Sequence, residues 1–443
     1  MSDTLLSVAT FTANQGFDVS PFFPTSKAFW NDTQIWDAAK DAPTLNGRTR
    51  LMHAAKIGDL ERAKWLLNRG ANVKARLHDD YEGVMHFTCW GESDSRAAAL
   101  AQLLIDAGAD VNAPDKYGST PVLKSARNGM VELTQTLIKN GANVNAMCFS
   151  DTPLIETCLR GYTNIARILI NAGADINAGA DRDGHTALMC AIKYSYYDLV
   201  DLLIKEGANV NALTENMDNT VLMVASVHSD DKIINALLDA GADINTRRVS
   251  DGHTALMRAC EQNPPAATLL IRRGADVNIS ATHTGITALL MASEAGRMGL
   301  VHLLIENGAD VNAEKALDGH TSLMIATRIG YTEIVKLLLE AKANPSACTT
   351  DDRYTSLMWA TENGFTDIVD LLLHHGASPD MCEWGGRTAM MWACQEGYIE
   401  ILKKLLLVGA DPDIEDDEGL TAWDYADRNH HYNITRFLTT PLD

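Results

Sequence analysis

Apolar residues along this chain recur in short bursts separated by polar turns. In Ile334–Leu339 the apolar side chains stand at positions i, i+1, i+4 and i+5, which is one stripe on a helix. A shorter apolar burst precedes it, after a turn-forming pair and a threonine. The pattern predicts a unit made of a turn, a short inner helix, a second turn, a longer outer helix and a loop.

Two phrases repeat throughout the sequence. The first, Gly-Ala-Asp-Val-Asn or a variant of it, begins at residues 70, 108, 141, 173, 207, 241, 274, 308, 342, 376 and 409. The second, Asp-Gly-His-Thr-Ala-Leu-Met, spans Asp183–Met189 and Asp251–Met257. Its threonine is a typical helix N-cap, and the glycine of the first phrase is a typical residue after a helix end. One helix pair cannot bury its stripe alone, so the repetition predicts an all-α solenoid of stacked pairs.

These phrases resemble the ankyrin repeat, whose Thr-Pro-Leu-His signature survives in part at Thr120-Pro121-Val122 and Thr152-Pro153-Leu154. The resemblance covers about residues 32–440 and implies a curved superhelix of helix pairs with β-hairpin-like turns. The histidine of the signature is mostly methionine here, as at Met189. We therefore expect packing to replace a hydrogen bond of the family at that position.

The repeat pattern predicts four segments. Residues 1–24 lie outside the repeats, 25–45 form a capping helix, 46–415 hold eleven repeats, and 416–443 form a terminal capping repeat. For the first segment, a free or packed end and a docking segment both stay open. Residues 92–96 are an insertion expected between the two helices of repeat two, and Pro264 is expected to begin an outer helix.

Composition and charge limit the classes of partner and the cellular compartment that we expect. The chain has 443 residues, 46% of them hydrophobic, and 37 basic against 58 acidic side chains give a net charge of −21. Such a surface repels nucleic acid and anionic membranes and suits a partner with a basic patch. The eight scattered cysteines form no CxxC pair, and neither a secretory signal nor a membrane span is recognisable. We expect a cytoplasmic protein that is a monomer on its own; export by a signal-independent route stays open.

No pattern indicates chemistry. His185, His253 and His320 recur one repeat apart and are interpreted as polar turn residues, because about 10 Å between neighbouring repeats is too far to share one zinc ion. The acidic run Asp411–Glu418 lacks the glycine and glutamate offsets of a calcium loop. No nucleophile elbow and no phosphate-binding loop occurs. The sequence predicts no enzyme, no cofactor and no metal.

Aromatic and arginine side chains at variable repeat positions mark where a partner would bind. The resemblance implies that turn tips and inner helices line a concave face used for binding. The predicted partner-binding residues are Tyr81, Trp90, Tyr117, Phe149, Tyr194, Arg353, Tyr354, Trp359, Trp384, Arg387, Trp392 and Tyr425. Among them Tyr354 and Trp384 are favoured as exposed anchors, whereas Trp359 and Trp392 also fit a core role. Trp423, at a leucine position, is expected in the core.

Two functions follow from this pattern. The first is a non-enzymatic interaction scaffold that holds a partner protein in its concave groove. The alternative is an inhibitor of an enzyme or toxin, of the immunity or effector type, that is steered to a basic target by its charge and blocks it sterically. A third reading, in which the repeats present an enzyme, requires a bound partner, because no segment outside the repeats is large enough for a catalytic domain.

Overall fold

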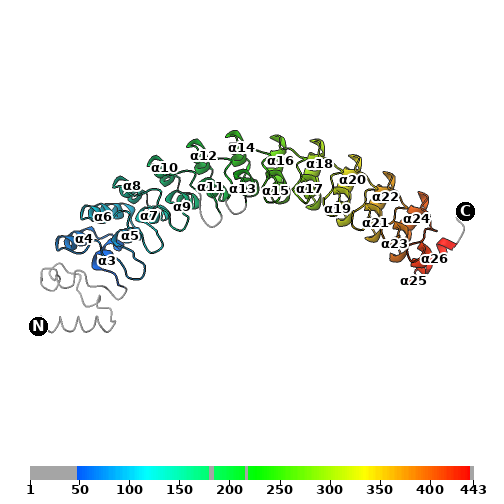
Figure 1. The fold of residues 1–443 in the computed structure, drawn as a ribbon, viewed down its shortest axis with the longest axis horizontal. Helices are drawn as coiled ribbons and strands as arrows, with labels where there is room; N and C mark the ends of the chain where they lie inside the picture. The colour runs from blue at the N-terminus through cyan, green and yellow to red at the C-terminus, as the bar shows by residue number, and fades with distance from the viewer. Residues whose placement is uncertain (1–46, 179–183, 215–217, 440–443) are drawn as a thin grey trace, which may run out of the picture. The chain divides into compact units, whose positions relative to one another are not determined.

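A computed structural model describes residues 47–178, 184–214 and 218–439 of the chain. The expected non-repeat segment 1–24 and capping helix 25–45 therefore lie outside the described residues. The chain divides into two compact units, residues 1–217 and residues 218–443. We call them the N-terminal unit and the C-terminal unit and describe each by itself (Figure 1).

The N-terminal unit consists of two rows of helices, with connecting loops beside the inner row (Figure 1). Its inner helices are α3 (Arg50–Ile57), α5 (Val84–Thr88), α7 (Pro121–Arg127), α9 (Pro153–Arg160) and α11 (Ala187–Lys193). Its outer helices are α4 (Leu60–Asn68), α6 (Asp94–Asp106), α8 (Val131–Lys139), α10 (Thr163–Asn171) and α12 (Tyr197–Lys205). Each inner helix packs on its outer partner and on the next inner helix.

The C-terminal unit repeats this plan. Its inner helices are α13 (Val221–His228), α15 (Ala255–Gln262), α17 (Ala288–Glu294), α19 (Ser322–Ile329), α21 (Ser356–Glu362), α23 (Ala389–Glu396) and α25 (Ala422–Arg428). Its outer helices are α14 (Asp231–Asp239), α16 (Pro264–Arg272), α18 (Met298–Glu306), α20 (Thr332–Glu340), α22 (Thr366–His374), α24 (Ile399–Leu407) and α26 (Tyr432–Thr439). The all-α solenoid is confirmed, and the described hairpins contribute only isolated β-bridges.

Threonine begins most inner helices as predicted. The hydroxyl oxygens of Thr49, Thr152 and Thr186, and of their equivalents from Thr220 to Thr388, accept a hydrogen bond from the backbone N–H three residues on, whereas that of Thr120 does not. This satisfies one of the N–H groups that have no partner within the helix. Thr421 differs, because its hydroxyl donates to the Asp424 carboxylate at 2.6 Å.

The signature position three residues after the N-cap keeps a hydrogen bond in repeat two, where it is histidine, and a weak one in three of the described repeats where it is methionine. In repeat two it is His86, whose Nδ1 accepts from the Gly83 N–H at 3.0 Å. Its other ring nitrogen therefore donates to the Ser119 carbonyl of the next repeat at 3.0 Å. The sulfur of Met52 accepts weakly from the Thr49 N–H at 3.4 Å, and Met223 and Met391 make the same contact in their repeats.

The asparagine of the repeated phrase, where it is present, links neighbouring repeats. In the C-terminal unit, Asn278 Oδ1 accepts from the Asp310 N–H at 2.8 Å and its Nδ2 donates to the Gly308 carbonyl at 2.9 Å. The same acceptor role recurs at Asn312, and in the N-terminal unit at Asn112 and Asn145. The phrase thus recurs because each copy pairs with the backbone of its neighbour.

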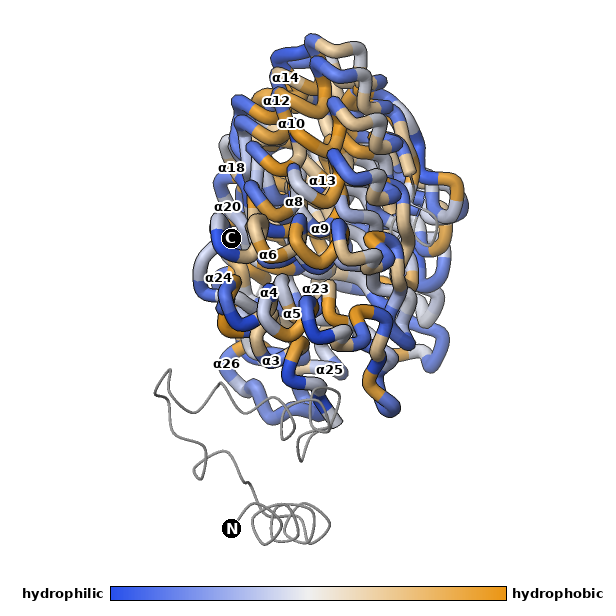
Figure 2. The backbone as a smooth tube through the Cα atoms, turned by 90° about the vertical axis from the view of Figure 1, so that its left-hand side faces the viewer, coloured by the Kyte–Doolittle hydropathy of each residue, from blue (hydrophilic) through white to orange (hydrophobic). Residues whose placement is uncertain are grey.

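Glycines after the inner helices let aromatic rings of the following repeat approach closely. A Cβ built on Gly364 would lie 2.9 Å from the ring of Tyr398, and one on Gly330 would lie 3.0 Å from Phe365. Figure 2 shows hydrophobic residues recurring within the helices, while the connecting segments are largely hydrophilic. The core therefore runs between the helix rows within each unit, with leucine, isoleucine, alanine and methionine fully buried.

The two irregular repeats keep this plan. Pro264 begins α16 as predicted. The insertion in repeat two, expected between the helices, instead lengthens the outer helix α6 at its start. Its Asp94 carboxylate accepts from the Glu132 and Leu133 N–H groups at 2.8 and 2.9 Å. The inserted turn therefore caps the outer helix of repeat three.

Candidate functional site

Exposed aromatic side chains gather at the loops of the N-terminal unit. All five residues predicted there are exposed, between 50% and 75% of their full area: Tyr81, Trp90, Tyr117, Phe149 and Tyr194. The Tyr117 and Phe149 rings have centroids 5.9 Å apart. Large exposed apolar groups that lie close together, as Tyr117 and Phe149 do, are typical of an interaction site.

Two of these aromatics have a strained backbone. Tyr81 has φ 55° and Phe149 has φ 59°, in the left-handed region that disfavours bulky side chains. Phe149 adopts this conformation in a turn that contains no glycine. A strained residue persists only where the surrounding structure enforces it, and such residues concentrate at binding sites.

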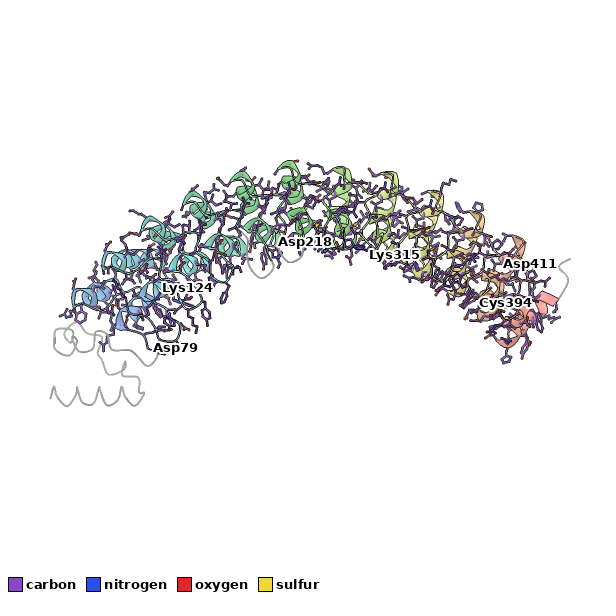
Figure 3. The ribbon with its side chains drawn as sticks, in the orientation of Figure 1. Asp79, Lys124, Asp218, Lys315, Cys394 and Asp411 are labelled. Atoms are coloured by element: carbon purple, nitrogen blue, oxygen red, sulfur yellow. The ribbon has the colours of Figure 1, made fainter. Side chains whose placement is uncertain are left out.

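A cavity of about 420 Å³ lies between these loops and the inner helices. Its rim carries Trp90, Tyr117 and Phe149, and its wall includes Lys124 and Arg127 of α7. Figure 3 labels Asp79 in the loop before α5 and Lys124 on the inner helix. The volume suits one or two side chains of a partner.

The cavity wall includes a buried ion triplet. Lys124 Nζ hydrogen bonds to a carboxylate oxygen of Glu82 and lies 3.0 Å from one of Asp115. Burial acts to lower the pKa of Lys124, but these two carboxylates outweigh it and raise the pKa. Burial acts to raise the pKa of Asp115, yet Lys124 and the N–H groups of Ser119 and Tyr117 bring it below its ordinary value. Lys124 and Asp115 therefore both remain ionised, and the triplet links the loops of Glu82 and Asp115 to α7.

A second ion triplet lies beside the cavity. The Glu156 carboxylate, whose side chain is 3% exposed, bonds to the guanidinium of Arg127 on the preceding inner helix and to that of Arg160 on its own helix. Arg127 Nε donates to it at 2.7 Å. Two partly exposed cations share one buried anion, so the excess positive charge of this triplet offsets the excess negative charge of the first.

Sequence reasoning missed both triplets. Lys124 and Glu156 occupy the position four residues after the N-cap, which is Phe87 in repeat two and Cys190 in repeat five. We call this series the inner column, because it supplies one residue per inner helix. The register is apolar or aromatic in most repeats, so the two residues of opposite charge in adjacent repeats, Lys124 and Glu156, are a usable signal.

In the C-terminal unit the prediction for Tyr354 as an exposed anchor is wrong. Its side chain is 6% exposed, its hydroxyl donates to Glu362 at 2.8 Å, and its ring centroid lies 4.5 Å from that of Trp359. Burial, followed by the nearby Glu362 carboxylate, raises the pKa of Tyr354. Arg353 just before it takes the left-handed conformation with φ 60°, which turns the tyrosine inward.

Arg387 packs between two aromatic rings of the inner column. Its guanidinium carbon lies 3.6 Å from the ring centroid of Trp392 and 4.7 Å from that of Tyr425. The Tyr425 hydroxyl donates to Asp416 at 2.6 Å, and burial together with this bond raises the pKa of Tyr425 to about 12. Cation–π contacts of this kind stabilise the side-chain arrangement.

Trp384 is exposed at the loop tip as predicted, at 64% of its area. Arg353 is exposed as well, whereas Trp359, Trp392, Arg387 and Tyr425 are partly exposed. Trp423, expected in the core, is 39% exposed, because it lies on the last inner helix with no further repeat described beyond α26 to cover it.

The histidines predicted as turn residues do occupy the loops. His253 Nδ1 lies 2.6 Å from the Asp251 carboxylate, whose pKa Arg248 and His253 hold well below its usual range. Among the described residues, no group of three or more His, Cys, Asp or Glu side chains could hold a metal ion. In the described part of the chain, no helix is long and apolar enough to cross a membrane.

Comparison with known proteins matches most of the chain to one family. The family model described as "Ankyrin repeats (3 copies)" matches residues 93–180, 178–248, 222–315, 289–383 and 379–441. A second, "Ankyrin repeat", matches residues 46–76.

Individual relatives align over shorter stretches. Serine/threonine-protein kinase 12 of Arabidopsis thaliana is 30% identical over 103 residues, 23% of this chain and 21% of the relative. Ankyrin repeat, SAM and basic leucine zipper domain-containing protein 1 of Carollia perspicillata is 33% identical over 90 residues, 20% of this chain and 18% of the relative. The matches thus span about a fifth of each relative. Among solved structures, the human ASB11 ankyrin repeat domain is 26% identical with a TM-score of 0.45, covering 52% of this chain and 99% of that domain.

Proposed function

Because this chain belongs to the ankyrin-repeat family, we propose that it captures a partner protein in the groove between the loops and inner helices of its N-terminal unit. Ankyrin repeats indicate a protein–protein interaction scaffold. The groove is the finer part of the proposal, and the observation that carries it is the row of exposed aromatics around the 420 Å³ cavity.

The aromatic row has the properties of an interface centre. Large rings such as Tyr117 and Phe149 supply most of the binding energy in protein interfaces. They stand exposed in the free protein although covering them would be favourable by about 25 cal/mol per Å². The strained backbone at Phe149 fixes its ring outward before a partner arrives, which lowers the entropy cost of binding. The two ion triplets hold the cavity wall in one arrangement.

The partner's chemistry follows from charge. A net charge of −21 attracts a protein with a basic patch and speeds its association at low salt, and it disfavours nucleic acid. We place the protein in the cytoplasm as a monomeric, non-enzymatic scaffold.

One substitution, Phe149→Gly, is expected to change stability and partner affinity in opposite directions, so it distinguishes an effect on binding from an effect on folding. Phe149→Gly removes the ring and also relieves the left-handed strain, so the free chain should become more stable by about 1 kcal/mol. Partner capture should nevertheless fall at least about tenfold. The partner is first identified by affinity purification and mass spectrometry, and its affinity is then titrated with purified proteins.

Two further variants complete the design. Tyr117→Ala should weaken the same partner, whereas Tyr432→Ala is the matched control because that exposed tyrosine lies on the outer helix α26. Equal affinity of wild type, Phe149→Gly and Tyr117→Ala for the purified partner would refute the proposed groove.

A further inference from the structure

The inner column of the last three repeats is aromatic. Trp359 on α21, Trp392 on α23 and Tyr425 on α25 follow one another at intervals of 33 residues, since 392 − 359 and 425 − 392 are both 33. The three inner helices pack side by side. Packed helices lie about 8–10 Å apart, so the column offers one ring roughly every 8–10 Å.

All three rings are partly exposed. Tyr354 packs between the two tryptophans from beneath, with ring centroids 4.5 Å from Trp359 and 6.0 Å from Trp392. Arg387 fills the space between Trp392 and Tyr425. The rings are therefore supported from within the unit, which fixes their spacing.

This spacing matches one type of ligand backbone. A polyproline II helix has three residues per turn and rises about 3.1 Å per residue, so residues three apart lie on one side about 9.3 Å apart. In a β-strand, residues three apart point to opposite faces. We propose that Trp359, Trp392 and Tyr425 form a docking track for a proline-rich polyproline II segment of a partner protein, with prolines three residues apart each packing on one ring.

Charge around the track favours a cationic residue at the end of such a segment. Glu383 lies near the carboxylates of Asp352 and Glu362, and burial together with these two carboxylates raises the pKa of Glu383 against the opposing effect of Arg387. An arginine or lysine of the ligand would relieve this repulsion. Exposed Trp384, next to Glu383, adds a ring on which its stem can pack.

Two hydrogen-bond donors of the track have no acceptor in the free protein. The indole Nε1 atoms of Trp359 and Trp392 are covered and have no hydrogen-bond acceptor. Leaving such a donor unpaired is unfavourable. A small rotation of either indole toward a bound segment would give its N–H a backbone carbonyl, because a polyproline II chain makes no internal hydrogen bonds and leaves its carbonyls free.

The test uses synthetic peptides and the full chain. The probe is a fluorescein-labelled peptide of one arginine followed by ten prolines, titrated by fluorescence anisotropy. Its comparison peptides are the ten prolines without arginine and one arginine followed by ten alanines, which favours an α-helix. The arginine–proline peptide should bind most tightly, the proline peptide at least about threefold more weakly, and the alanine peptide weakest.

The variants are chosen to keep the fold. Trp392→Met and Trp359→Met introduce the residue that the same register already carries at Met291, and each should weaken the peptide at least about tenfold. Arg258→Ala changes the same register in repeat seven, outside the track, and should leave the affinity unchanged. Circular dichroism of each variant establishes that the helices are retained.

This inference rests on the proposed function only in that both require a binding surface on the inner side, and the two fail separately. If Phe149→Gly loses peptide binding while Trp392→Met keeps it, the peptide binds in the N-terminal cavity and the proposed track is wrong. Tighter binding of the alanine peptide, or no binding of any peptide, would overturn it too. If the wild type binds the peptide as expected, but Phe149→Gly and Tyr117→Ala capture the partner as well as the wild type does, only the proposed groove is wrong.

Discussion

The contact between Gly364 and Tyr398 gives a sharp test of how neighbouring repeats fit together. Gly364 has φ +71°, and a Cβ there would lie 2.9 Å from the ring of Tyr398 in the next repeat. Gly376, in the same repeat, has φ +85° with no atom within 4 Å of such a Cβ. The change to alanine at these two positions therefore differs mainly in the ring contact.

The expected magnitudes follow from this geometry. Alanine in the left-handed region costs about 1–2 kcal/mol, and both variants bear that cost. Carbon atoms pack comfortably at about 3.5–4.0 Å, so at Gly364 the rigid ring must move by more than half an ångström. Overpacking of this kind adds about 1–3 kcal/mol. Gly364→Ala should therefore lower the free energy of unfolding by about 2–5 kcal/mol and Gly376→Ala by about 1–2 kcal/mol.

Urea unfolding followed by far-ultraviolet circular dichroism measures both effects, with tryptophan fluorescence as a second probe near Trp359 and Trp392. The double variant Gly364→Ala with Tyr398→Ala completes the cycle. Once the ring is gone, the cost of Gly364→Ala should drop to that of Gly376→Ala. If the two glycine variants lose equal stability, or if removing the ring leaves the cost unchanged, the close approach of ring to glycine does not limit the packing of these repeats.

Three further outcomes are expected. Asn278→Ala removes one accepted and one donated hydrogen bond to the next repeat and should cost about 1–3 kcal/mol in urea unfolding; an unchanged midpoint would show that these bonds contribute nothing. Glu156→Gln leaves two guanidinium groups without their shared anion and should lower stability by about 2 kcal/mol, an effect that Glu132→Gln on the surface of α8 should not reproduce. The pKa of Asp115 is lower in the folded than in the unfolded protein, so the ionised carboxylate stabilises the fold above the unfolded-state pKa, and this stabilisation is lost as the pH falls through the folded-state pKa. Between pH 7 and pH 3 the wild type should therefore lose more stability than Asp115→Asn. Parallel curves of unfolding free energy against pH for the two proteins would contradict this.

The residues of the proposed binding surface could largely be predicted from the sequence, but not the orientation of each side chain. Tyr81, Trp90, Tyr117, Phe149 and Tyr194 were identified by their positions beside the turns, and all are exposed. The same reasoning failed for Tyr354, because a residue that follows a left-handed turn points inward or outward according to the neighbours it meets. Glu362 and Trp359 hold Tyr354 inside, and neither contact has a signature in the spacing of the sequence.

The sequence by itself determined the repeat length, the helix pairs, the threonine caps and the glycines with positive φ, because each depends on residues close together in the chain. Only the tertiary structure decided how the inner column is used: it brings Lys124 to Glu82 and Asp115, Glu156 to Arg127, and Arg387 between Trp392 and Tyr425. Most of these partners stand about one repeat apart or more in the chain. Whether these side chains touch depends on how far each one reaches across the packed helices. The repeat spacing of the sequence contains no information on this reach.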